Sequence, residues 1–266
     1  MESKILYNRR FVARTVFLAA IVAWVWRYQN GILLHQIGVP VLQNPSIDYA
    51  YWAWSYSGIA HQIMAQNWGF WIDLGWLSAA IGMVIYYRNN VLPVLFWVCA
   101  VAYHLTLNLY DCWMNAFFLG FLLVPIPFFT KKTPLFSLLM EGLRYYVVFI
   151  YFSAFLWKVF GLFFLNIEEG QAVISQSLGF WLYERPHDFS TQIYTFFINH
   201  PQLSYAMFLL GAISQAFFVV GFFTKKYDKI LVFLAVSFHI LAYYFIDVPF
   251  FELLVLQIVF LNKEKQ

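Results

Sequence analysis

Charged side chains are scarce in this sequence. Only 11% of its 266 residues are Asp, Glu, Lys or Arg, whereas a soluble domain carries about a quarter. This scarcity excludes an ordinary soluble domain. The net charge of +3 is therefore no evidence for nucleic-acid binding. The sequence is instead 62% hydrophobic and 23% aromatic. We therefore predict an all-α polytopic integral membrane protein that binds no nucleic acid.

Cysteine and the common catalytic motifs are also scarce. The two cysteines, Cys99 and Cys112, lie thirteen positions apart. On one helix they would be separated by roughly 20 Å, too far for a disulfide bond. The sequence contains no CxxC pair, metal-ligand spacing, nucleophile elbow or phosphate-binding loop. We accordingly expect neither a disulfide framework nor a metal site.

Long apolar runs are abundant. A membrane-spanning helix needs about 20 largely apolar residues. No soluble domain separates or flanks the apolar runs, so we interpret residues 1–266 as a single transmembrane domain. The runs predict about eight spans, at residues 11–27, 68–87, 91–110, 113–129, 137–165, 203–223, 229–246 and 248–262.

Lysine and arginine predict the orientation of these spans. With eight helices, the basic residues cluster on the side of the two termini, and the other side has only Arg27 and Arg185. Because basic loops stay in the cytoplasm, we predict that both termini are cytoplasmic, in a bacterial inner or cell membrane. The first apolar run has no small-x-small cleavage site, so we interpret it as an uncleaved signal anchor.

Two segments on the predicted outer side are long, at residues 28–66 and 166–202. The first is rich in Trp and Tyr, which favour the headgroup zone of a bilayer. The second offers Asn166 as a helix cap and Glu168 and Glu169 in the first turn. We predict interfacial helices on the outer face, around residues 46–66 and 167–183. They either anchor the protein in lipid or form a lid over an outward-opening cavity.

Ionisable residues inside the predicted spans are candidates for function, because inserting them into a bilayer is costly. Glu141 and Arg144 are three residues apart and can satisfy each other on one helix. Asp73 and Asp111 lie near helix ends, where we expect water to hydrate them. The full set inside the spans is Arg14, Asp73, His104, Glu141, Arg144, Lys158, His239 and Glu252.

Lys158 has two interpretations from its position alone. It is the one charged residue in "YFSAFLWKVFGLFF", residues 151–164. Its four-carbon stem can carry the amine toward the interface. Alternatively, a lysine kept from water gives up its proton more easily and can act as a base. His239 is equally open between a satisfied buried imidazole and a catalytic group.

Several motifs between residues 90 and 260 resemble a known family. They include "YFSAFLWKVFG" followed by "NIEEGQAVISQSLGFWL", the later "VSFHILAYYFIDVPFFELLVLQIVFL" and the earlier "DCWMNAFFLGFLL". In their order along the chain, these motifs are similar to the membrane region of vitamin K-dependent γ-carboxylase, and they cover most of residues 90–260. The chain thus resembles the horizontally transferred transmembrane (HTTM) family.

The resemblance implies a specific chemistry. In the carboxylase, the matching lysine deprotonates reduced vitamin K, and oxygenation then generates a base strong enough to remove a γ-proton from glutamate before carbon dioxide adds. By position, this implies Lys158 as the base and His239 as a second catalytic residue. It also implies Asn115, Tyr151 and Trp157 at the site of a quinone-like lipophilic cofactor. If enzymatic, the activity would be carboxylase-like or quinone-oxygenase-like, of the lyase or ligase type.

Two departures from the family pattern limit that implication. Asn115 stands where the family has a histidine, and the sequence ends at Gln266 without the large extramembrane domain that recruits the glutamate-rich substrate. Complete γ-carboxylation by this chain alone is therefore not expected. Short family members resembling the membrane component of the sporulation-delaying toxin system imply a non-enzymatic alternative, a scaffold for maturation or export of a small peptide or protein. A lipid or small-molecule carrier is a third alternative.

The enzymatic hypothesis makes a prediction about the surroundings of Lys158. Its side chain should face an outward-opening cavity that His239 also lines. Phe155, Trp157 and Phe160 should then form a dry lining around the amine, and not a lipid-facing surface. Membrane lipid is an expected partner under all three hypotheses.

Overall fold

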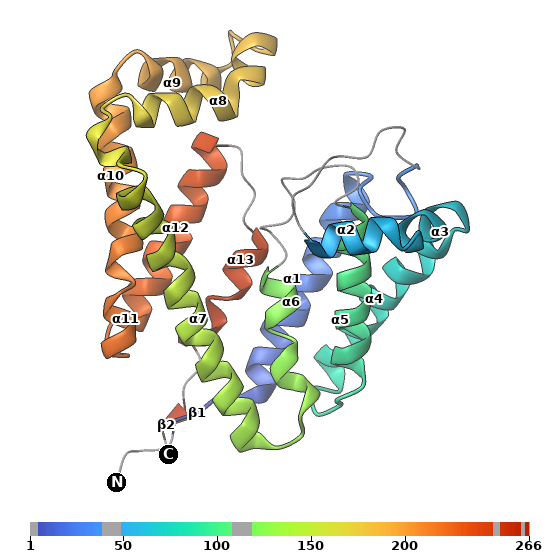
Figure 1. The fold of residues 1–266 in the computed structure, drawn as a ribbon. Helices are drawn as coiled ribbons and strands as arrows, with labels where there is room; N and C mark the ends of the chain where they lie inside the picture. Colours follow the sequence, from blue (N-terminus) through green and yellow to red (C-terminus); the bar gives the residue numbers. More distant parts are fainter. Residues whose placement is uncertain (1–4, 39–48, 108–118, 247–250, 262–263, 266) are drawn as a thin grey trace. The chain divides into compact units, whose positions relative to one another are not determined.

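The computed structural model describes residues 5–38, 49–107, 119–246, 251–261 and 264–265 (Figure 1). This part of the chain is overwhelmingly helical. It also contains the two-residue strands β1 (Ile5–Leu6) and β2 (Glu264–Lys265), which pair antiparallel. Asp111, Cys112 and Asn115 lie outside the described residues.

Five helical segments of the described chain are long and apolar enough to cross a membrane. They are α1 (Arg9–Gln29), α4 (Trp68–Ile85), α7 (Thr133–Phe160), the segment Pro201–Phe223, and α12 (Asp228–Ile246). This confirms an all-α, membrane-embedded protein. Three further apolar segments are shorter, at Leu92–Leu107, Gly120–Phe129 and Glu252–Leu261. They coincide with the other three predicted spans, but a crossing needs about 20 residues, so the number of eight spans stays a prediction.

The remaining elements are shorter helices between and after these segments. The segment Pro201–Phe223 itself consists of α10 (Pro201–Phe217) and α11 (Val220–Phe223). The others are α2 (Tyr49–Tyr56), α3 (Ile59–Ala65), α5 (Leu92–Leu107), α6 (Leu119–Leu123), η2 (Ile126–Phe129), η3 (Phe163–Leu165), α8 (Glu169–Glu184), α9 (Phe189–Ile198), α13 (Phe251–Val255) and α14 (Ile258–Leu261).

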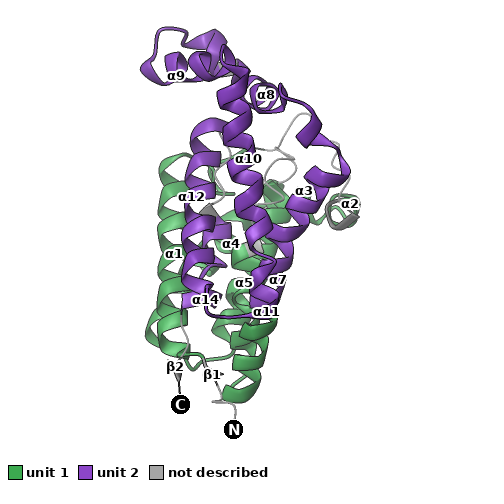
Figure 2. Cartoon of the chain, turned by 90° about the vertical axis from the view of Figure 1, so that its left-hand side faces the viewer, with its two compact units in different colours: residues 1–143, 262–266 green, residues 144–261 purple. Residues whose placement is uncertain are grey.

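The chain separates into two compact units, shown in different colours in Figure 2. Unit 1 comprises residues 1–143 and 262–266, and unit 2 comprises residues 144–261. The interpretation of residues 1–266 as one transmembrane domain stays a prediction.

Unit 1 is built around α4, which packs against both α1 and α5. Its core is aromatic: Phe96 meets both Phe17 and Trp76 edge to face, with ring centroids 5.1 and 6.0 Å apart. Such edge-to-face pairs add to the stabilisation from burial alone. The short helices α2 and α3 run crosswise to α4 and α5 at one end of this unit (Figure 1).

Unit 2 is built around α10, which packs against α8, α9 and α12. Gly170 is required where α8 crosses α10, because a Cβ at this position would collide with the backbone of Ser204. An apolar cluster of Ile174, Leu178 and Tyr194 holds α8 and α9 together. These two helices run crosswise to α10 and α12 (Figure 1).

The predicted interfacial segments are helical in the described residues, as α2, α3 and α8. One detail is wrong: the N-cap position of α8 is Glu168, two residues after the predicted cap, and its side chain makes no capping hydrogen bond. Asn166 instead lies just ahead of the helix, where its side-chain oxygen accepts the backbone N–H of Glu168 at 3.0 Å. The predicted span 137–165 is also shorter at its end than expected. Helix α7 stops at Phe160 because the backbone turns at Leu162, which has a positive φ of 55°.

Candidate functional site

Helix α7 carries three polar side chains at intervals of seven residues, Arg144, Tyr151 and Lys158. Seven residues make almost two helical turns, so each step advances roughly 10 Å along the axis and stays on nearly the same face. All three belong to unit 2. We call these residues, together with their partners Gln215, Asp228, His239 and Gln257, the α7 seam.

Lys158 is the last member of the seam along α7. Its Nζ donates to the side-chain oxygen of Gln215 on α10, at 2.9 Å, and to the backbone oxygen of Ala154, at 3.3 Å. Gln215 is buried, with 4% of its surface exposed, and Lys158 is half-buried. This geometry favours an amine fixed against the neighbouring helix over one that extends freely to the interface.

Tyr151 forms the centre of the seam. Gln257 donates its side-chain N–H to the Tyr151 hydroxyl at 2.9 Å, and that hydroxyl lies 2.5 Å from Nε2 of His239. Since the hydroxyl already accepts from Gln257, its own proton is available for His239. The Tyr151 ring also stacks on Phe218, with centroids 4.1 Å apart. His239 is therefore a buried imidazole held by a tyrosine.

Arg144 forms the third part of the seam, with Asp228 at the start of α12. Its Nη2 and Nε lie 2.7 and 3.1 Å from the two oxygens of Asp228, and Nη2 also donates to the carbonyl of Thr224 at 3.1 Å. Arg144 is fully buried. A two-point contact of this kind is the strong form of an ion pair.

The sequence predicts that Glu141 and Arg144 pair with each other on one helix. That prediction overlooked a partner far away in the sequence for each of them. Arg144 engages Asp228, 84 residues away. In unit 1, Glu141 accepts a hydrogen bond from the Tyr7 hydroxyl at 3.3 Å. Residue spacing within one helix cannot predict these contacts, because the partners lie 84 and 134 residues apart.

The dry lining predicted around Lys158 is wrong for two of its three members. Trp157 is 71% exposed and Phe160 is 77% exposed. Trp157 is adjacent to Lys158 in the helix, so its side chain points about 100° away from the seam. Phe155 is half-buried and lies against Phe152 and Phe164. The assignment of Trp157 to a cofactor site stays a prediction, made for a side chain that faces outward.

The structure places His239 and Lys158 in different parts of the seam. His239 contacts Tyr151, and Lys158 lies two turns further along α7. Their shared cavity stays a prediction. A cavity of about 260 Å³ in unit 2 includes neither residue. It lies among α8, α9 and α12 and is lined by Leu178, Trp181, Arg185, Asp188, Ser190, Tyr194, Tyr243 and Tyr244.

Unit 1 holds the candidates Asp73 and His104. Asp73 is only 1% exposed and binds His35, so its predicted hydration is wrong. Nε2 of His104 lies 3.4 Å from Nη2 of Arg27. The Arg27 guanidinium lies over two aromatic rings that also contact each other, 4.7 Å from the centroid of Trp76 and 4.8 Å from that of Tyr103.

Two ionisable candidates remain. Arg14 is exposed on α1 and Glu252 is buried at α13. Across the described residues, no group of three His, Cys, Asp or Glu side chains is arranged to hold a metal ion. The α7 seam contains the predicted base, Lys158, and we therefore take it as the candidate site.

Comparisons with protein-family models, with curated proteins and with solved structures found no match to this chain.

Proposed function

We propose that this protein is an HTTM-type membrane enzyme in which Lys158 is the base that removes a hydroxyl proton from a reduced, quinone-like lipid. The observation that carries the proposal is the hydrogen bond between Lys158 Nζ and the buried Gln215 oxygen, at 2.9 Å. It fixes the amine on the side of α7 that faces other helices. A lysine that serves only to reach the interface would gain nothing from such a partner.

The number of acceptors around Lys158 supports this role. A neutral amine has two N–H groups and one lone pair, whereas an ammonium has three N–H groups. Gln215 and Ala154 provide two acceptors, which match the two N–H groups of the neutral amine. In the described part of the chain, Lys158 has no carboxylate partner that would favour the charged form. The lone pair is then free to accept a proton.

Several residues of the seam have a role in the proton transfer. Lys158 accepts the proton of a bound hydroxyl group, and a reduced quinone-like lipid would supply that proton when bound. The Gln215 and Ala154 oxygens then hold the new ammonium by charge-assisted hydrogen bonds. Tyr151, two turns away along α7, and its partner His239 on α12 maintain the helix packing that positions Lys158.

The proposal includes the finer features of the topology. The three shorter apolar segments complete eight spans, and the termini are cytoplasmic because the basic residues cluster on their side. In this arrangement α2, α3, α8 and α9 lie at the outer face of the cell membrane.

The experiment that tests the proposal is oxygen uptake driven by a reduced lipophilic naphthoquinone, with purified protein in lipid nanodiscs. We expect uptake by the unmodified protein and its loss in Lys158→Met. Lys132→Met is the matched control, because Lys132 is exposed outside the membrane-spanning helices. No uptake by the unmodified protein, or equal uptake by Lys158→Met, would contradict the proposal.

A second candidate, a scaffold for a small peptide or protein, is favoured by the surface of α8 and α9. Tyr183 is 84% exposed and Phe189 is 77% exposed in these crosswise helices. Exposed aromatic side chains are enriched at protein interfaces and at membrane interfaces. If the protein is a scaffold, substitution of Tyr183 and Phe189 by Ser should abolish its effect on the partner, while Lys158→Met should leave that effect unchanged.

A further inference from the structure

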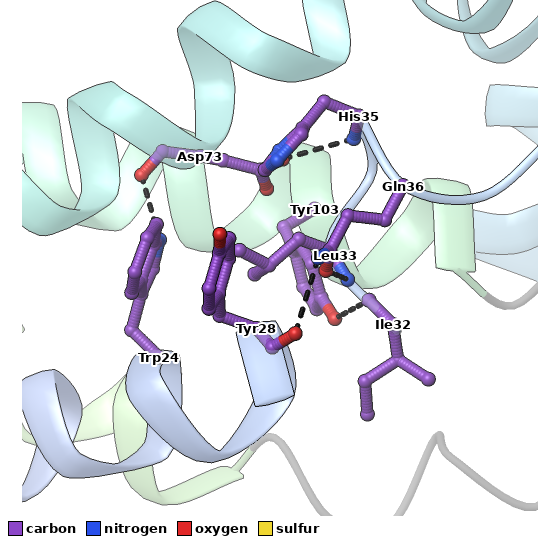
Figure 3. Close-up of polar contacts among 8 residues, drawn as sticks. All are labelled: Trp24, Tyr28, Ile32, Leu33, His35, Gln36, Asp73 and Tyr103. Atoms are coloured by element: carbon purple, nitrogen blue, oxygen red, sulfur yellow. Dashed lines mark hydrogen bonds and ion pairs between the residues drawn. The ribbon is translucent and has the colours of Figure 1, made fainter. Parts of the chain in front are cut away.

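Outside the α7 seam, unit 1 holds a histidine–carboxylate pair, His35 and Asp73. Nδ1 of His35 lies 2.8 Å from Oδ2 of Asp73, and the backbone N–H of His35 donates to the same oxygen at 3.0 Å (Figure 3). Asp73 is buried in α4, whereas His35 lies in the segment that follows α1 and has 27% of its side-chain surface exposed. A buried carboxylate thus supports a histidine that reaches the surface.

The segment around His35 is held rigidly. The Tyr103 hydroxyl donates to the carbonyl of Ile32 at 2.5 Å, and the Gln36 side chain accepts from the Leu33 N–H and donates to the Tyr28 carbonyl. Figure 3 shows these contacts around the His35–Asp73 pair. The segment also lies directly on α4 at Gly69, where a Cβ would come within 2.8 Å of the Leu34 Cβ. The imidazole is therefore preorganised.

The pair defines the hydrogen-bonding state of the ring. A carboxylate accepts and cannot donate, so His35 Nδ1 carries the proton and the neutral ring presents a lone pair at Nε2. Among the described residues, Nε2 has no hydrogen-bond partner, and His35 is an exposed residue. The other Asp73 oxygen, Oδ1, is buried without a partner in the same part of the chain. A proton taken up at Nε2 would strengthen the Asp73 contact into a charge-assisted one.

The surroundings of His35 define the ligand class. The Phe70 ring meets His35 edge to face with centroids 5.8 Å apart, and the Tyr28 ring lies at 6.4 Å. Phe70 and Tyr28 are 46% and 51% exposed, and Trp71 next to Phe70 is 67% exposed. Aromatic side chains of this kind favour the headgroup zone of a bilayer. The ligand should therefore have an apolar body and one hydroxyl group.

We propose that His35 and Asp73 form a proton-accepting dyad that binds the hydroxyl group of a membrane amphiphile through His35 Nε2. The hydroxyl donates to Nε2, and complete transfer would leave an imidazolium paired with Asp73 and an oxyanion on the amphiphile. The O–H bond is broken, the N–H bond is formed, and the total charge is unchanged. This dyad is independent of Lys158 and of the function proposed for it.

The test is protection of His35 from carbethoxylation by diethylpyrocarbonate, measured by mass spectrometry on protein in nanodiscs. The amphiphiles are a long-chain alkylphenol and a diacylglycerol, each compared with its methyl ether. We expect a hydroxylated amphiphile to slow modification of His35 several-fold and its ether to have no effect. His61 on α3 is the internal reference, because it is exposed in the same unit and should react equally in all samples.

Each outcome decides the proposal. Protection by the phenol alone assigns a phenolic ligand, protection by the diacylglycerol alone assigns a lipid ligand, and both outcomes support the dyad. Equal protection by hydroxyl and ether, or none by either hydroxyl compound, would overturn it. In Asp73→Asn the protection should be lost, and its full retention would also overturn the dyad. If that variant does not fold, nitrogen NMR of the unmodified protein decides: a neutral His35 protonated at Nε2 would overturn the proposal.

Discussion

The two units stabilise their buried polar groups in different ways. In unit 2, Arg144 and Tyr151 on α7 meet Asp228 and His239 on α12, so side chains of separate helices satisfy each other. In unit 1, the guanidinium of Arg27 lies over the rings of Trp76 and Tyr103, and Asp73 is covered by the segment that contains His35. Buried polar groups in a bilayer need partners inside the protein. Unit 2 provides them from side chains on a neighbouring helix, and unit 1 provides them from aromatic rings and from the backbone and side chain of His35.

The largest loss should follow from breaking the ion pair of the seam. Asp228→Asn leaves the fully buried Arg144 without its counter-charge. We expect a decrease of about 3–5 kcal/mol in the free energy of unfolding, measured by denaturant titration in micelles. The double variant Arg144→Met, Asp228→Leu is the control and should recover most of the loss, because it removes both charges. A single variant as stable as the unmodified protein would show that the pair does not hold α12 to α7.

A smaller loss is expected at the centre of the seam. Tyr151→Phe keeps the stacking on Phe218 but removes the hydroxyl that contacts His239 and Gln257. Since both partners are buried, the free energy of unfolding should fall by about 1–3 kcal/mol. Tyr145→Phe is the matched control, at a half-exposed position of the same helix. Equal stabilities of the two variants would show that the Tyr151 hydroxyl does not stabilise the seam.

The corresponding change in unit 1 should cost less. Arg27→Lys keeps the charge but replaces the planar group that lies over Trp76 and Tyr103. We expect a loss of about 1–2 kcal/mol, again from denaturant titration. Arg14→Lys, at an exposed position of the same helix, should change stability little. The contrast between units would fail if Arg27→Lys cost as much as Asp228→Asn.

The smallest effect is expected at Trp157. This side chain is 71% exposed beside Lys158, so Trp157→Leu should change the free energy of unfolding by no more than about 0.5 kcal/mol. Thermal melting in micelles checks this. A clearly larger loss would mean that Trp157 packs against protein, as a cofactor-lining residue would.

Much of the helical architecture was predictable from the sequence. The run at residues 11–27 predicts α1 (Arg9–Gln29), and the run at 229–246 predicts α12 (Asp228–Ile246), because each apolar stretch ends at polar residues. The end of α7 was missed although Gly161 directly follows it, and glycine often ends helices. The positive φ itself falls on Leu162, a residue type that rarely adopts it. Hydrophobicity defines where helices lie but not where the backbone turns.

The partners of the site residues were not predictable in the same way. Lys158 was identified from its isolation, but Gln215 lies 57 residues away and Gln257 lies 106 residues from Tyr151. Both are neutral, so a search for charge in apolar helices passes over them. The seven-residue spacing of Arg144, Tyr151 and Lys158 was a signal in the sequence that could have located the seam. His35 carried no such signal, because it lies between predicted spans.

The central claim is that Lys158 acts as a base and not as a buried positive charge. The most direct measurement is hydroquinone-driven oxygen uptake by Lys158→Arg, compared with Lys158→Met and the unmodified protein in nanodiscs. Arginine keeps the charge and can still donate to Gln215, but it does not give up its proton. The account predicts that both variants remain folded and lose uptake by about 100-fold or more. Uptake by Lys158→Arg at the level of the unmodified protein would contradict it.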